Sequence, residues 1–135
     1  MSISRKQARE AVFKLVYGLG FEAEMEKELG TEELALVSDE MPKGPEFAFI
    51  QDTFRTVVDN LSEIDDIIRA KARDFSFERL FRIDLALLRL GIAEMRYTDT
   101  PHVVVMSTII DLAKKYSTQK SVTFVNGVLG SVEGK

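Results

Sequence analysis

A long apolar segment, LFRIDLALLRLGIAEM at residues 80–95, sets the strongest limit on the fold of this 135-residue chain. Its hydrophobic side chains point in almost every direction around a helix, and Arg82, Asp84 and Arg89 interrupt them. A helix that is hydrophobic nearly all round is normally buried among other helices. We therefore expect a central helix here. We expect its three polar residues to form a narrow exposed strip or buried ion pairs. The alternative is that they bind a partner protein.

Amphipathic helices are expected on the N-terminal side of this segment. Apolar residues recur every three or four positions after Ser4, a plausible N-cap, and again from residue 46 onward. A separate helix is expected after Ser62, with Asp65 completing a capping box. The acid-rich stretch 22–46 predicts one short helix followed by a variable loop.

Two more helices are expected on the C-terminal side. Thr100 and Pro101 are typical of a helix start, and the apolar period continues to Tyr116. The last segment, SVTFVNGVLGSV, contains Asn-Gly, which favours a hairpin turn, but its aliphatic residues gather on one helical face. We therefore expect a helix with Phe124 at the edge of that face, and a neighbouring helix close to Gly127. The aliphatic residues are Val122, Val125, Val128, Leu129 and Val132.

Together these patterns predict an all-α fold of about seven helices in a single domain. The chain has no cysteine, which excludes disulfides, thiolate nucleophiles and sulfur-bound metals. It shows neither a membrane-spanning run nor the apolar core of a signal peptide, so we expect a cytoplasmic protein that does not enter membranes.

The net charge of -4 at pH 7 is unevenly distributed. Residues 1–14 carry four basic side chains and one acidic one, whereas residues 22–46 carry nine acidic residues and two lysines. A second basic cluster consists of Lys114, Lys115 and Lys120. Local basic patches of this kind bind polyanions, although the overall acidity argues against indiscriminate coating of nucleic acid. The alternative is that these charges only solvate helix faces.

The sequence offers no catalytic or metal-binding pattern. His102 is the single histidine and has no companion ligands, and we expect it exposed in the first turn of its helix. We therefore expect a binding protein without catalytic residues, metal or cofactor. Single-stranded RNA is held by cations on its phosphates and aromatic rings on its bases. Arg5, Lys6 and Arg9, on the polar face of the first helix, would supply the cations. Phe124 would supply a ring, unless it is only a core residue.

Several motifs are similar to those of one known family. They are Ala8-Arg9-Glu10, Ile83-Asp84-Leu85-Ala86-Leu87-Leu88-Arg89-Leu90, Asp111-Leu112-Ala113-Lys114 and Phe124-Val125-Asn126-Gly127-Val128-Leu129. From end to end, the chain resembles the NusB family of transcription antitermination and termination factors. The resemblance implies an all-α fold of two small packed helical bundles, about residues 1–75 and 76–135, and no enzymatic activity.

The resemblance also implies partners and contact residues. Proteins of this family bind the boxA element of ribosomal RNA leader transcripts, together with the small-subunit ribosomal protein NusE, and join the antitermination complex on RNA polymerase. The implied partner contact is Asp84. The implied RNA contacts are Arg5, Lys6, Arg9, His102, Lys120, Ser121 and Phe124.

Two alternatives stay open. Gln7, Ser107 and Thr108 depart from the family pattern, which suits a protein-interaction module of the same fold with weakened RNA binding. A homodimer that covers the RNA-binding face is also compatible with the sequence.

Overall fold

The computed structural model describes residues 3–20 and 44–132, and within these ranges the chain is helical with no strand. The predicted all-α class is therefore confirmed. The short helix and loop expected in the acid-rich stretch lie outside the described residues, apart from the last few positions before residue 46. The elements are α1 (Arg5–Leu19), α3 (Pro45–Asp59), α4 (Leu61–Lys71), the 3-10 helix η2 (Phe77–Arg79), α5 (Arg82–Tyr97), α6 (His102–Tyr116) and α7 (Gln119–Gly130).

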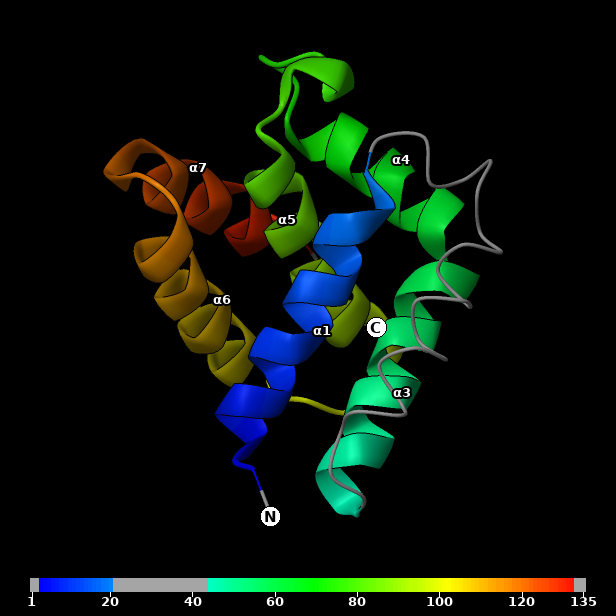
Figure 1. Cartoon of the computed structure of the whole chain (residues 1–135). Coiled ribbons are helices and arrows are strands. Elements are labelled where there is room, and N and C mark those ends of the chain that lie inside the picture. Colours follow the sequence, from blue (N-terminus) through cyan, green and yellow to red (C-terminus); the bar gives the residue numbers. More distant parts are fainter. Residues whose placement is uncertain (1–2, 21–43, 133–135) are drawn as a thin grey trace.

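Helix α5 is the centre of the fold, as its sequence predicts. Residues 84–95 are all buried, and α5 packs against each of the other α-helices in the described ranges. Figure 1 shows α6 and α7 on one side of α5, α3 and α4 on the other, and α1 crossing in front. The helix begins at Arg82, later than expected, because residues 77–79 form the separate turn η2. Since α5 joins both halves, the division into bundles 1–75 and 76–135 stays a prediction.

A glycine lets α5 and α7 approach closely. A Cβ atom placed on Gly91 would lie 2.9 Å from Cδ1 of Leu129, which is nearer than packed carbon atoms come. Glycine at this position therefore lets the Leu129 side chain of α7 pack against the backbone of α5. No helix among the described residues is both long and apolar enough to cross a membrane.

Arg89 of α5 forms a buried ion pair, one of the expected alternatives. Its guanidinium donates to both carboxylate oxygens of Asp65 in α4, at 2.8 and 2.7 Å, and both side chains are fully buried. The expected capping role of Asp65 is wrong. Helix α4 starts at Leu61 without a side-chain cap, and the carboxylate turns inward to neutralise Arg89.

The ends of the helices follow the local sequence closely. Ser4 and Gln7 form a reciprocal capping box at the start of α1. At the other end of α1, exposed Arg82 donates to the carbonyl oxygens of Tyr17 and Gly18, at 3.0 and 3.3 Å. Helix α6 starts one residue later than expected, with Pro101 as its N-cap.

The last segment is a helix rather than a hairpin. Thr118 caps α7 by accepting from the backbone N–H of Ser121, and all five predicted aliphatic residues are buried. The expectation for Gly127 is wrong, because no described atom beyond its chain neighbours and the adjacent backbone of α7 lies within 4 Å of the position its Cβ would occupy. Unlike Gly91, this glycine faces open space.

Candidate nucleic-acid interface

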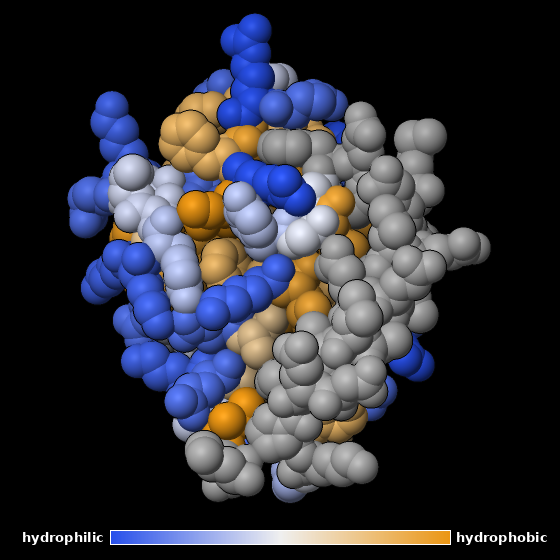
Figure 2. Space-filling model, in the orientation of Figure 1, coloured by the Kyte–Doolittle hydropathy of each residue, from blue (hydrophilic) through white to orange (hydrophobic). Residues whose placement is uncertain are grey.

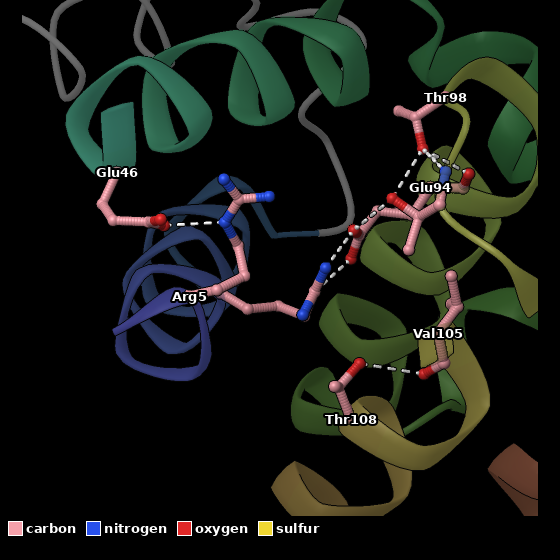
Figure 3. A network of polar contacts seen from close by, with 8 residues as sticks. Arg5, Glu46, Glu94, Thr98, Val105 and Thr108 are labelled. Atoms are coloured by element: carbon pink, nitrogen blue, oxygen red, sulfur yellow. Dashed lines mark hydrogen bonds and ion pairs between the residues drawn. The ribbon is translucent and has the colours of Figure 1, made fainter. Parts of the chain in front are cut away.

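The basic residues at the start of α1 are largely engaged with the protein itself. Arg5 donates to Glu46 at the start of α3, at 2.7 Å (Figure 3). Its guanidinium lies 4.1 Å from the ring centre of Phe49. The Arg5 side chain stays half exposed, at 50%. Lys6 is exposed and has no ion-pair partner among the described residues. Of these two cations, Lys6 is the freer to meet an anionic ligand.

Arg9 is not on the exposed face, and this prediction is wrong. Its guanidinium donates two hydrogen bonds of 2.8 Å to the carboxylate of Glu94, in the buried half of α5. The side chains of Arg9 and Glu94 are 5% and 0% exposed. A carboxylate in an apolar interior requires a counter-ion, and the helix that faces Glu94 provides Arg9. Arg9 therefore fixes α1 against α5 in this structure.

A basic hollow of about 430 Å³ lies between α1 and α6. It is lined chiefly by Lys6, Arg9, Glu10, Thr108, Lys114 and Lys115, and Asp111 also reaches it. Figure 2 shows hydrophilic side chains gathered over α6 and the N-terminal part of α1. We call it the α1–α6 hollow.

Glu10 neutralises part of the charge in the α1–α6 hollow. Lys115 donates to its carboxylate at 2.8 Å, and the hydroxyl of Tyr116 donates to the same oxygen. These hydrogen bonds lower the pKa of Glu10, and the bond to Glu10 raises the pKa of Lys115. The cations here without an ion pair among the described residues are therefore Lys6 and Lys114.

His102 lies at the N-terminal end of α6. It is the first residue of α6 and is exposed, as expected. It does not line the α1–α6 hollow. No group of three or more His, Asp or Glu side chains in the described part of the chain is arranged to hold a metal ion.

Ser121 and Asp84 form a buried pair where α7 meets α5. The hydroxyl of Ser121 donates to Oδ2 of Asp84 at 3.0 Å, and that of Ser117 to Oδ1 at 3.3 Å. Ser121 is 2% exposed and Asp84 is 4% exposed. Burial raises the pKa of Asp84, while the two serine hydroxyls oppose this shift. Ser121 therefore acts in this structure by holding the start of α7 to α5.

Phe124 is at the edge of the apolar face of α7, as predicted. It is partly buried and meets Phe75 edge to face, with ring centres 4.9 Å apart. We call these two rings the aromatic ridge. Phe75 and nearby Phe81 are 54% and 64% exposed. In Figure 2, hydrophobic side chains reach the surface between α7 and the start of α5.

The aromatic ridge borders an apolar hollow of about 250 Å³, which we call the α5–α7 hollow. Besides the two rings it is lined by Arg79, Leu80, Phe81, Asp84, Lys120 and Ser121. Arg79 and Lys120 are exposed and have no ion pair among the described residues. The hollow thus combines aromatic side chains with two cations that have no ion pair among the described residues. The buried Asp84 also lines it.

Sequence reasoning missed Phe75, Arg79 and Phe81. Their signal is the segment DFSFERLF, which places three phenylalanines and one arginine just before the central helix. The structure brings three of the predicted residues, Lys120, Ser121 and Phe124, to this hollow. Arg5 does not lie beside them. It is at the N-terminal end of α1, and Figure 1 shows α7 nearer the other end of that helix.

The sequence and the fold are similar to those of known proteins. The NusB family profile matches residues 6–134. The transcription antitermination protein NusB of Natranaerobius thermophilus is 33% identical over 131 residues, which cover 96% of this chain and 94% of the relative.

Solved structures agree with this match. T. maritima NusB superposes with a TM-score of 0.79 and 31% identity, covering 96% of this chain and 90% of that one. A crystal structure of the antitermination factors NusB and NusE in complex with double-stranded RNA gives a TM-score of 0.77 at 31% identity, covering 94% and 93%. The family profile, the sequence relatives and the superposed structures agree over nearly the whole chain, which therefore belongs to the NusB family.

Proposed function

We propose that this chain is an RNA-binding transcription factor of the antitermination complex on RNA polymerase. It binds boxA-like single-stranded RNA of ribosomal RNA leader transcripts together with the ribosomal protein NusE, and it has no enzymatic activity. Support comes from family membership and from the structural neighbour in which NusB and NusE are in complex with double-stranded RNA. The action takes place in the cytoplasm, where leader transcripts are made.

The observation that carries this proposal is the α5–α7 hollow. Proteins that bind single-stranded nucleic acid combine cations along the backbone with aromatic rings under the bases. Phe124 offers a ring at the surface, and Arg79 and Lys120 offer positive charge that no described carboxylate neutralises. In the proposal a base stacks on Phe124 while a neighbouring phosphate meets Lys120.

The α1–α6 hollow provides a second contact for the same RNA. Lys6 and Lys114 bind phosphates there, with Arg5 and His102 as outer contacts at the ends of α1 and α6. Arg9 and Ser121 support binding indirectly, because they hold α1 and α7 against α5. Asp84 is 4% exposed and contributes to the NusE contact chiefly by holding Ser117 and Ser121 in place.

The test compares the affinity of the chain for boxA RNA and for a scrambled RNA, by fluorescence anisotropy with NusE present. Phe124→Ala is expected to weaken boxA binding by about 1–3 kcal/mol, which is roughly 5- to 150-fold. The matched control is Phe47→Ala, a partly buried phenylalanine of α3 that lines neither hollow. If Phe124→Ala leaves the RNA affinity intact and only lowers the melting temperature, Phe124 is a core residue and the proposal loses its main contact.

Salt dependence tests the electrostatic part of the proposal. The logarithm of the affinity should fall with the logarithm of the salt concentration, with a slope of about 0.7 for each phosphate neutralised. Lys120→Gln should reduce that slope by roughly one such unit. An affinity that does not change with salt would exclude phosphate contacts as the source of binding.

A second candidate function is a protein-interaction module of the same fold with weakened RNA binding. The neutralised state of Arg5, Arg9 and Lys115 favours it, because these cations already have carboxylate partners. Capture of NusE with equal affinity in the presence and absence of boxA RNA, and no preference for boxA over the scrambled RNA, would support it. Sedimentation at several concentrations would show whether the chain forms a homodimer.

A further inference from the structure

A second hollow lies on the other side of the aromatic ridge. It has a volume of about 230 Å³ and lies where the end of α4 meets α7. Phe75 and Phe124 line both this hollow and the α5–α7 hollow, so the two rings form a common wall between them. We call it the α4–α7 hollow. Its other lining residues include Lys71, Arg73, Asp74, Thr123 and Gly127.

The charge of the α4–α7 hollow suits an anionic group. Lys71 and Arg73 are exposed, and neither has an ion-pair partner among the described residues. Asp74 reaches the same hollow without pairing with either cation, which leaves one net positive charge. Lys71 also stabilises the C-terminal end of α4 through the helix dipole, but Arg73 lies beyond that helix.

Gly127 is the unexplained residue of this hollow. A glycine inside a helix costs about 1 kcal/mol relative to alanine. Packing explains Gly91, where a Cβ would collide with Leu129, but no described atom beyond its chain neighbours and the adjacent backbone of α7 lies within 4 Å of a Cβ at Gly127. The missing side chain therefore leaves open space on the surface of α7, at the floor of the hollow. An external ligand that approaches the α7 backbone would use that space.

We propose that the α4–α7 hollow is a second nucleotide-binding subsite, so that the RNA strand crosses the aromatic ridge. One base stacks in the α5–α7 hollow against Phe124, the next nucleotide lies over Gly127, and its phosphate meets Lys71 and Arg73. This inference rests on the proposed function, because it needs a single-stranded RNA already held beside Phe124. It adds Phe75, Lys71, Arg73 and Gly127 to the contact surface.

The test uses a matched pair of substitutions on α7. Gly127→Glu places a carboxylate in the hollow, whereas Gly130→Glu makes the same change of charge one turn further on, at a glycine that does not line it. Both positions are exposed and open, so both variants are expected to keep the wild-type melting temperature within a few degrees. The affinity of each full-length variant for a synthetic boxA RNA is measured at low salt with NusE present.

We expect Gly127→Glu to weaken RNA binding at least tenfold and Gly130→Glu to change it less than threefold. Lys71→Met should reduce the salt slope by about 0.7 if its phosphate contact forms. Equal RNA affinities of the two glutamate variants would overturn the second subsite. A Gly127→Glu variant that loses NusE capture but keeps its RNA affinity would overturn it as well. Failure of the proposed function itself looks different, because the wild-type chain would then show no preference for boxA and no dependence on Phe124.

Discussion

The buried ion pair of Arg9 and Glu94 gives the sharpest stability prediction. Replacing Arg9 by methionine leaves the Glu94 carboxylate, which is 0% exposed, without a counter-ion. Its remaining side-chain contact among the described residues is the hydroxyl of Thr100, at 3.4 Å. Removing one member of such a pair costs roughly 3–5 kcal/mol. The melting temperature should then fall by on the order of 10–20 °C, since a domain of this size loses several degrees for each kcal/mol.

Removing both charges should restore most of that loss. In the double variant Arg9→Met/Glu94→Leu, side chains of similar length fill the same space and no charge is left in the interior. Replacing a complete buried pair by hydrophobic residues is often neutral or stabilising. We therefore expect the free energy of unfolding to return to within about 1 kcal/mol of wild type or to exceed it.

The assay is urea unfolding of wild type, both single variants and the double variant, followed by circular dichroism. The four values form a double-mutant cycle that isolates the coupling between the two side chains. A loss below about 1 kcal/mol for Arg9→Met, or a double variant less stable than either single variant, would refute the reasoning. The double variant also tests RNA contact. Its boxA affinity should equal that of wild type if the Arg9 guanidinium stays in its pair.

Two further predictions concern packing and pH. Gly91→Ala should lower the free energy of unfolding by about 0.5–2 kcal/mol, measured in urea, because the collision of its methyl group with Leu129 outweighs the roughly 1 kcal/mol that alanine gains in a helix. Loss of less than half a kcal/mol would mean that α7 shifts freely. Glu10 has a pKa lowered below its ordinary value of 4.5, chiefly by Lys115, so its stabilising effect is present above pH 4.5 and is lost as the pH falls through the lowered value. Glu10→Gln should therefore be less stable than wild type at pH 6, with a smaller difference at pH 3. A constant difference would contradict this account.

The positions of the helices could be predicted because their signals are local. Apolar periodicity depends on neighbours a few residues apart, and the capping box at Ser4 involves only the next turn. The all-round hydrophobicity of residues 80–95 also predicted which helix is central, since such a segment can only be buried.

The partners of charged residues could not be predicted in the same way. Arg9 has the spacing of a polar-face residue, and its burial depends on Glu94, 85 positions away. Asp65 fits a capping box, but the approach of Arg89 from α5 gives its carboxylate a stronger partner. Apolar periodicity and composition do not determine which helices pack against each other. These ion pairs could therefore be identified only from the tertiary structure.

The candidate site was predicted only in part for the same reason. Phe124 could be placed at a helix edge from the angle between residues on α7. The ring that faces it belongs to Phe75, in the irregular segment after α4, where no helical period fixes the direction of a side chain. The open space at Gly127 could not be foreseen either, because glycine inside a helix normally indicates close packing.

The buried guanidinium of Arg89 has a consequence for the order of events during synthesis. Its three donors in the described structure reach Asp65 and the carbonyl oxygen of Gly20, and both acceptors precede Arg89 in the chain. Both segments leave the ribosome before α5. The Asp65 carboxylate and the Gly20 carbonyl oxygen therefore lack the Arg89 guanidinium until α5 has emerged. The first 75 residues should accordingly stay unstructured or aggregate when released alone, and the whole domain should fold in one cooperative step after α5 is complete.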